Sequence, residues 1–160
     1  MVEAITDYVL SLDDNPLQGR PERLPLKLAG DGMTPHYQDN EAGQVTLHSR
    51  ESLAAVGVAI GDANFNELRF RHNIVIDGVA AWEEQSWVGG RLRVGEVAFE
   101  TVVPKVRCLA THANPLTGER DLQVMQLLMK MFAQREPTFG VGMLSEAGGE
   151  IKVGDTVALA

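Results

Sequence analysis

Cys108 is the residue of this sequence with the most distinctive chemistry, because it is the only cysteine and it lies among basic side chains. Lys105, Arg107 and His112 are its neighbours in the chain. Cationic neighbours favour the thiolate, which is the form of cysteine that attacks, binds metal or carries sulfur. A free cysteine is also commonly a small buried hydrophobic residue. The residues alone leave both interpretations open.

A second polar group precedes the apolar run Ile74–Ile76, which has the composition of a buried strand. Arg69 and Arg71 enter this run and require anionic partners there. Arginine offers a planar fork of donors that matches phosphate or carboxylate, and Asn73 offers both a donor and an acceptor for the edge of a heterocycle. Salt bridges to the chain's own acids are the alternative for both arginines.

Three further positions carry weaker signals. Ser49 is predicted to cap a helix over 50–56, and a helix start of this kind also suits an anion. Glu83 and Glu84 are adjacent, so in a strand they would point to opposite faces, and we expect both to be solvated. His112 can share a strand face with Cys108 and donate a proton, or it can be an ordinary surface histidine.

The segments around Cys108 read as strands and one helix. Alternating apolar residues predict a strand that ends at Pro104, because proline cannot donate to a ladder, so Cys108 lies just beyond a strand end. Residues 114–118 combine Asn, Pro and Gly in a turn. Asp121 is then expected to cap a helix over 121–134 that is apolar on most sides and closes one end of a barrel.

Two segments resemble each other and predict hairpins. Residues 91–99 are expected to turn at Gly95-Glu96, and residues 150–159 at Gly154-Asp155. Short hairpins with glycine breaks favour a β-barrel over a parallel sheet. A short helix is also expected to begin at Asn64. We therefore predict a mostly β protein with a few helices.

Bulk properties limit the classes of function. A chain of 160 residues is the size of one domain, and a net charge of −8 argues against nucleic acid or an anionic membrane as the main partner, although a local basic patch can still hold a phosphate. One cysteine permits no internal disulfide, and the sequence shows neither a signal peptide nor a run long enough to span a bilayer. A reducing cytoplasm is the expected location.

The first 43 residues are expected to be irregular. Ile5, Val9 and Leu12 fit one short helix or strand, and the prolines after them prevent any long element. Residues 24–28 permit a short edge strand. His36 and Tyr37 are expected in an exposed loop.

Two segments in this order resemble the MOSC domain, named for the C-terminal domain of molybdenum cofactor sulfurases. They are Arg69–Asp121, with its Arg-x-Asn block, Arg-Cys pair and Thr-Gly turn, and Phe139–Leu159, with its closing Gly-Asp hairpin. The resemblance implies a single domain over 1–160, with a family-like core over 44–160. It also implies the family's fold, a β-barrel like that of pyruvate kinase.

The resemblance further implies a molybdenum–molybdopterin cofactor. Cys108 would be the metal ligand and catalytic residue, Arg71 and Asn73 would contact the pterin, and Arg107 and Ser49 would lie near the cofactor. This sequence has His72 where the family pattern has proline, and Val141-Gly142 where relatives carry a tyrosine. It also has no recognisable copy of the N-terminal region with which related reductases contact the cofactor phosphate.

These observations lead to two hypotheses. In the first, the protein binds the cofactor or its sulfur through Cys108 and acts in sulfur transfer or in the reduction of N-hydroxylated compounds. Its partners would be a cysteine desulfurase, which would carry any pyridoxal phosphate, or an electron-transfer protein, and a homodimer is also compatible with the apolar helix. In the second, the barrel is non-catalytic and serves as an interaction or carrier module.

Overall fold

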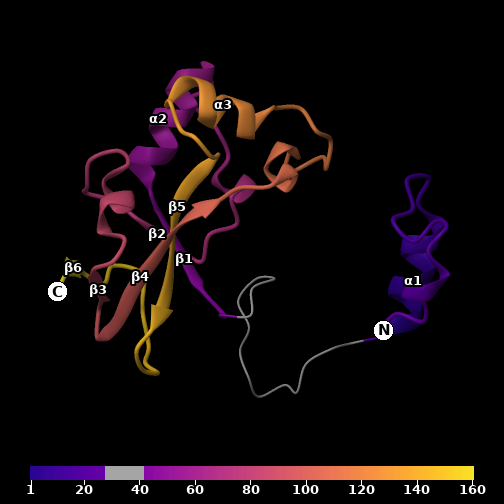
Figure 1. Ribbon diagram of the computed structural model, residues 1–160, viewed down its shortest axis with the longest axis horizontal. Coiled ribbons are helices and arrows are strands. Elements are labelled where there is room, and N and C mark those ends of the chain that lie inside the picture. Colours follow the sequence, from indigo (N-terminus) through magenta and orange to yellow (C-terminus); the bar gives the residue numbers. More distant parts are fainter. Residues whose placement is uncertain (28–41) are drawn as a thin grey trace. The chain divides into compact units, whose positions relative to one another are not determined.

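The computed structural model describes residues 1–27 and 42–160. The chain divides into two compact units, Met1–Pro35 and His36–Ala160. All of the site residues predicted above lie in the second unit, which is shown in magenta to yellow in Figure 1.

The first unit contains the short helix that the sequence predicts. Helix α1 spans Val2–Ser11, and the 3-10 helix η1 spans Pro21–Arg23. Residues 24–27 form no strand, so the expected edge strand is wrong for these residues. Leu28, His36 and Tyr37 lie outside the described residues.

Among the described residues, the second unit is built on one sheet of six strands in the order β2-β1-β5-β4-β3-β6 (Figure 1). Strand β1 pairs in parallel with β2, and the other neighbours are antiparallel. The strands are β1 Val45–Ser49, β2 Ile74–Ile76, β3 Arg91–Val94, β4 Val97–Val106, β5 Thr138–Ser145 and β6 Val157–Leu159.

Helices lie between these strands in the chain. Helix α2 follows β1 directly, and Figure 1 shows α2 and α3 together at one end of the sheet. The helices are α2 Arg50–Ile60, η2 Glu67–Arg69, η3 Glu83–Trp87, η4 Leu109–His112 and α3 Val124–Met131.

Two clusters of buried side chains hold this unit together. One lies on the inner face of the curled sheet, where alternate residues such as Leu92 and Val94 of β3 point inward. The other joins the helices to the end of the sheet, where Val124 and Leu128 of α3 pack with Phe139 of β5. The sheet forms a curled half-barrel, so the predicted class, mostly β with a few helices in a barrel-like sheet, is confirmed.

Strand β4 is longer than the sequence predicted, because Pro104 does not end it. The strand continues to Val106, and its register against β5 shifts between Thr101 and Val103 and again between Pro104 and Val106. Such shifts interrupt the regular ladder, so a residue without an N–H can be accommodated there. Cys108 still lies just past the end of the strand, as predicted.

Several element boundaries also differ from the predictions. Helix α3 begins at Val124 and not at Asp121, because the Asp121 carboxylate is engaged by Arg69. Asn66, and not Asn64, caps the short helix η2, by accepting a hydrogen bond from the N–H of Leu68. Only the second half of the expected 150–159 hairpin is a strand, whereas the 91–99 hairpin forms as predicted between β3 and β4.

Candidate functional site

Cys108 lies at the surface and its backbone is held in place. It is the N-terminal flanking residue of η4, it has extended backbone angles, and its side chain is exposed. Its carbonyl oxygen accepts hydrogen bonds from the N–H and the hydroxyl of Thr111, at 3.1 and 2.9 Å. The interpretation of Cys108 as a buried hydrophobic residue is therefore wrong, and the thiol is accessible to a ligand.

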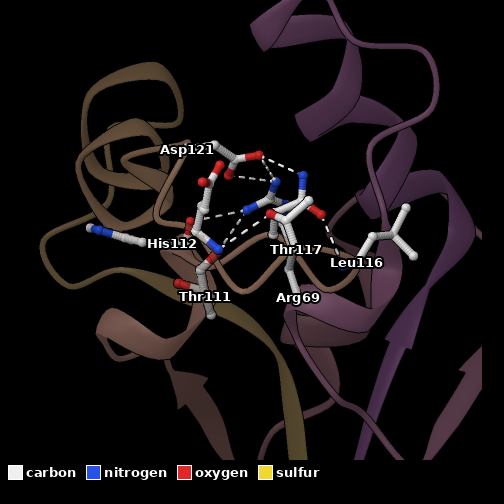
Figure 2. Close-up of polar contacts among 8 residues, drawn as sticks. Arg69, Thr111, His112, Leu116, Thr117 and Asp121 are labelled. Atoms are coloured by element: carbon white, nitrogen blue, oxygen red, sulfur yellow. Dashed lines mark hydrogen bonds and ion pairs between the residues drawn. The ribbon is translucent and has the colours of Figure 1, made fainter. Parts of the chain in front are cut away.

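The loop after Cys108 is fixed by the buried side chain of Arg69 (Figure 2). The Arg69 Nη1 atom donates to the carbonyl of His112 at 3.2 Å, and its Nη2 atom lies 2.7 Å from Oδ1 of Asp121. Asn114 donates from Nδ2 to the same carboxylate at 2.8 Å. Arg69 thus connects His112 to Asp121 across the loop. For this arginine, the interpretation as a salt bridge to one of the chain's own acids is confirmed.

His112 is not a surface histidine. Its side chain is buried, and its Nε2 atom accepts a hydrogen bond from the N–H of Met125 at 3.3 Å. The first N–H groups of a helix have no partner within the helix, so His112 satisfies one of those of α3. The expectation that His112 and Cys108 share a strand is also wrong, because His112 ends η4.

Arg107 is partly buried and contacts only neutral groups in the described part of the chain. Its Nη2 atom donates to the carbonyl of Phe70 at 2.5 Å, and its Nη1 atom lies 3.4 Å from Nε2 of His72. Its guanidinium carbon lies 5.6 Å from the centre of the Phe70 ring. Burial lowers the pKa of Arg107, and the negative charge of the nearby Cys108 in its thiolate form acts in the opposite direction. The guanidinium and the thiol are therefore electrostatic neighbours.

Lys105 extends this positive region. Its Nζ atom donates to Oε1 of Gln44 at 2.9 Å. Its pKa is lowered by burial and by the charge of Arg107. Arg71 lies between the two residues that Arg107 contacts, is exposed, and has a left-handed backbone with φ 51°.

A pair of histidines underlies this region. His48 is 1% exposed, and neither of its ring nitrogens has a hydrogen-bond partner among the described residues. Its ring centre lies 4.9 Å from that of His72, edge to face. Burial, Arg50 and Arg107 lower the pKa of His48 to about 4, and burial and Arg107 lower that of His72 well below its ordinary value. Both rings are neutral at pH 7.

Gly140 makes room for this histidine pair. Its φ of 68° lies in the left-handed region, and a Cβ placed there would collide with Cε1 of His72 and the carbonyl of Leu47, and would lie 2.9 Å from Nδ1 of His72. Glycine at this position lets strand β5 approach the ring closely.

Ser49 caps α2, as predicted, and lies in a buried polar cluster. Its hydroxyl accepts from the N–H of Ser52 at 3.0 Å and lies 3.1 Å from Oε2 of Glu84. The hydroxyl of Ser52 also donates to that oxygen at 2.9 Å. Glu84 is fully buried on η3, so its predicted solvation is wrong, whereas Glu83 is exposed as expected. The adjacency argument failed because these residues form a 3-10 helix and not a strand.

Asn73 faces two environments. Its Oδ1 atom accepts hydrogen bonds from the N–H and the hydroxyl of Thr46, at 2.9 and 3.0 Å, which ties the start of β2 to β1. Asn73 also lines a groove of about 910 Å³ between β2 and β6, the two edge strands of the sheet. Neither Cys108 nor Arg107 lines this groove, so the groove and the surroundings of Cys108 are separate features of the surface.

The structure therefore brings together part of the predicted site. Arg107, next to Cys108 in the chain, contacts Phe70 and His72, which are the chain neighbours of Arg71. Asn73 lies two residues beyond Arg71, and Ser49 is enclosed with Glu84. Sequence reasoning missed His48 and Glu84. No sequence signal pointed to the burial of His48, because β1 reads VTLHS and His48 falls, like Thr46, on a polar position of the alternation.

The region around Cys108 is positively charged and contains unpaired buried polar atoms among the described residues. The thiol is exposed, cations flank it without carboxylate partners in the described residues, and buried polar atoms of His48 and Arg107 are unpaired there. Across residues 1–27 and 42–160, no group of three or more His, Cys, Asp or Glu side chains is placed to hold a metal.

The curled half-barrel sheet with its helices α2 and α3 defines a mostly β protein of the barrel-like class, in which an exposed thiol lies just past the end of β4. The family described as MOSC domain matches residues 34–158, so the chain belongs to the MOSC domain family. The resemblance seen in the sequence is thereby confirmed.

The similar proteins agree with this assignment. Bovine mitochondrial amidoxime reducing component 2 is 32% identical over 127 residues, which are 73% of this chain and 37% of that protein. Human molybdenum cofactor sulfurase is 36% identical over 76 residues, which are 48% of this chain and 8% of that protein. A crystal structure of a hypothetical protein, 18% identical, has a TM-score of 0.53 over 72% of this chain and 50% of that one.

The chain spans only part of the length of its relatives, 29% of human mitochondrial amidoxime-reducing component 1 and 37% of the bovine protein. What the family supports in general is an association with the molybdenum cofactor. In the part of the chain that the structure describes, no helix is both long and apolar enough to cross a membrane.

Proposed function

We propose that this protein binds a molybdenum–molybdopterin cofactor, or a sulfur-bearing form of it, with Cys108 as the metal ligand. The observation that supports this proposal is the exposed thiol of Cys108 beside Arg107, in an acidic chain whose cations at this place lack carboxylate partners in the described residues. A thiolate is a soft ligand and suits molybdenum. An anionic pterin would supply the missing negative charge.

Each candidate residue has a distinct role in this proposal. Cys108 presents its sulfur from a backbone fixed by Thr111. Arg71 and Arg107 bind anionic groups with their guanidinium donors. Asn73 offers its amide to the edge of the heterocycle, while its Oδ1 atom stays bonded to Thr46. The hydroxyl of Ser49 is already engaged by Glu84, so we assign Ser49 to positioning α2 next to the site.

The reaction we propose is sulfur transfer or the reduction of N-hydroxylated compounds. The bound metal would supply the two-electron chemistry, and the protein would bind and orient. A cysteine desulfurase carrying pyridoxal phosphate, or an electron-transfer protein, would be the partner. A cytoplasmic location, a homodimer and a single MOSC domain over 1–160 belong to the same proposal.

The test is metal and pterin analysis of protein purified from a molybdenum-replete host. We expect molybdenum and pterin near one per chain, lost in Cys108→Ala and in Cys108→Ser. Because Cys108 is exposed, neither change should alter the thermal unfolding of the cofactor-free protein, and comparing the cofactor-free forms separates ligand loss from misfolding. If molybdenum and pterin stay bound to Cys108→Ala, the sulfur is not the ligand.

A non-catalytic carrier or interaction module is the second candidate. The enclosure of Ser49 with Glu84 favours it, because one of the expected cofactor contacts is occupied by the protein itself. Absence of both molybdenum and pterin from native protein made in the replete host would support this candidate and overturn the first.

A further inference from the structure

The groove between strands β2 and β6 is the open side of the half-barrel. It has a volume of about 910 Å³. The side chains of Ile76, Leu92 and Val94, which belong to the buried cluster on the inner face of the sheet, also line the groove. The floor of the groove is therefore a continuation of the hydrophobic core, and the sheet ends on either side of it.

Strand β6 turns unpaired backbone groups toward this groove. The N–H of Ala160 donates to the carbonyl of Arg91 at 3.0 Å, next to the three paired positions of β3 and β6. In an antiparallel pair, only every second residue bonds to the neighbouring strand. The N–H and C=O groups of Val157 and Leu159 therefore face away from β3, and no backbone partner for them is found in the described part of the chain.

Strand β2 presents the same kind of edge from the other side. The N–H of Asn73 donates to the carbonyl of Thr46 at 3.0 Å, and β2 then runs parallel to β1. Because alternate residues of a parallel strand bond to the same neighbour, the backbone groups of Ile74 and Ile76 point away from β1. Both residues line the groove. Within residues 42–160, two edges with unpaired backbone groups thus border the same space.

The two edge strands also run in the same direction. Strand β2 is parallel to β1, and the four remaining pairs of neighbours, from β1 through β5, β4 and β3 to β6, are all antiparallel. Four reversals of direction leave β6 parallel to β1 and β2. A single strand placed between β2 and β6 can therefore be antiparallel to both, which is the slightly more stable pairing.

Apolar side chains are exposed beside the groove. Leu159 is paired with the buried Leu92, so its side chain lies on the inner face of the sheet, yet it is 60% exposed. Ile151 and Val153 also line the groove, and they are 40% and 108% exposed. Exposed apolar patches of this kind mark interaction sites. An occupant with apolar side chains on the inner face would cover them.

The charges of the groove that lack a partner are negative. The lining cation Arg50 forms an ion pair with Glu67 at 3.8 Å, and Lys152 forms one with Glu150 at 3.6 Å. In the described residues, three lining carboxylates take part in no ion pair, those of Asp77, Glu83 and Asp155. A second copy of this chain, with its net charge of −8, is a poor match for them, whereas a basic partner is complementary.

We infer that this groove binds an extended segment of a partner protein in which apolar residues alternate with lysine or arginine. The segment adds as a strand between β2 and β6 and runs antiparallel to both. Its apolar side chains cover the core, and its basic side chains meet the carboxylates that line the groove. In this mode of recognition the main-chain hydrogen bonds give affinity and the alternating side chains give specificity. The inference goes beyond the proposed function and does not depend on the cofactor.

The experiment measures the fluorescence anisotropy of labelled peptides titrated with the full chain. The probe is a blocked peptide of about seven residues in which valine and lysine alternate, which is within the usual length of a strand. One control has the same side chains but N-methyl groups on alternate backbone amides, and another has glutamate in place of lysine. Because several backbone hydrogen bonds are lost, the methylated peptide should bind at least about tenfold more weakly. The glutamate peptide should also bind more weakly than the lysine peptide. Failure of the lysine peptide to bind, or equal binding of the methylated peptide, would overturn the inference.

Two pairs of variants locate the binding. Leu159→Pro and Leu159→Ala both remove the leucine side chain, but only proline removes an N–H, one that faces the groove and takes no part in pairing with β3. We expect Leu159→Pro to bind the lysine peptide about fivefold more weakly than Leu159→Ala, with unchanged thermal unfolding. Glu83→Gln should weaken binding about two- to fivefold, whereas Glu119→Gln changes an exposed acid outside the groove and should have no effect. Equal affinities within both pairs would refute the strand addition.

A second copy of this chain is the competing occupant. Sedimentation of the native protein that shows a dimer, dissociated by Leu159→Pro and unable to bind the peptide, would assign the groove to that copy and overturn the inference. Cys108→Ala should bind the peptide as the native chain does, because Cys108 does not line the groove. Peptide binding by a protein that carries no molybdenum would keep this inference and remove the proposed cofactor, so the two proposals fail separately.

Discussion

Replacing Gly140 by alanine should destabilise the protein far more than the same change at a matched glycine. At Gly140 an added methyl group meets both the His72 ring and the Leu47 carbonyl, and φ is 68°. The left-handed backbone costs alanine about 1–2 kcal/mol, and overpacking typically costs about 1–3 kcal/mol more. We therefore expect Gly140→Ala to lower the free energy of unfolding by about 2–5 kcal/mol.

Gly118 is the matched control, because its φ is 79° and nothing lies within 4 Å of an added methyl group. Gly118→Ala should cost only the backbone term of about 1–2 kcal/mol, and the gain from a less flexible unfolded chain is the same at both positions. The assay is urea denaturation followed by the fluorescence of Trp82 and Trp87, both in the second unit. Equal losses for the two variants would refute the close approach of β5 to His72.

Three further predictions concern the surroundings of the site. The pKa of His48 falls from 6.5 to about 4 on folding. As the pH is lowered, His48 therefore takes up a proton in the unfolded chain before it does so in the folded protein. The stability that is present above pH 6.5 is lost between pH 6.5 and 4. Denaturation at pH 7 and 4.5 should show a loss of about 2 kcal/mol that His48→Gln reduces. In the same assay, Glu84→Gln should lower the free energy of unfolding by about 1–3 kcal/mol, because it disturbs a buried acceptor of two serine hydroxyls. The control Glu83→Gln changes an exposed side chain and should alter the free energy of unfolding by no more than about 0.5 kcal/mol. Arg69→Gln should speed amide hydrogen exchange in residues 109–121 without changing that of β5, and unchanged exchange in the loop would contradict the role of Arg69 as its anchor.

The sequence predicted the surroundings of Cys108 where local patterns determine them. Alternating apolar residues and the 91–99 hairpin gave the strand before Cys108, and Ser49 gave the start of α2. The prediction that the strand ends at Pro104 was wrong, because it used only the local sequence. The register shifts that accommodate Pro104 depend on pairing with β5, which is another part of the chain. Local rules cannot supply that register.

The buried polar groups were not predictable in the same way. Glu84 looked solvated because the adjacency argument assumed a strand, and its serine partners lie more than 30 positions earlier in the chain. His48 and His72 meet only because β1 and β2 pair in parallel and Gly140 leaves room for the ring. Each of these contacts depends on long-range packing that no window of sequence contains.

The net charge of −8 and the local positive charge of Lys105 and Arg107 are compatible, because they act over different distances. Net charge keeps an acidic protein away from nucleic acid and anionic membranes, which present extended negative surfaces. A small dianion meets only the local field, within a Debye length of about 10 Å at 0.1 M salt. Lys105 and Arg107 make the field beside Cys108 more positive than the net charge of the chain indicates. Composition therefore identifies the extended polyanions that the surface repels, while the placement of Lys105 and Arg107 determines the local charge that the proposed anionic cofactor would meet.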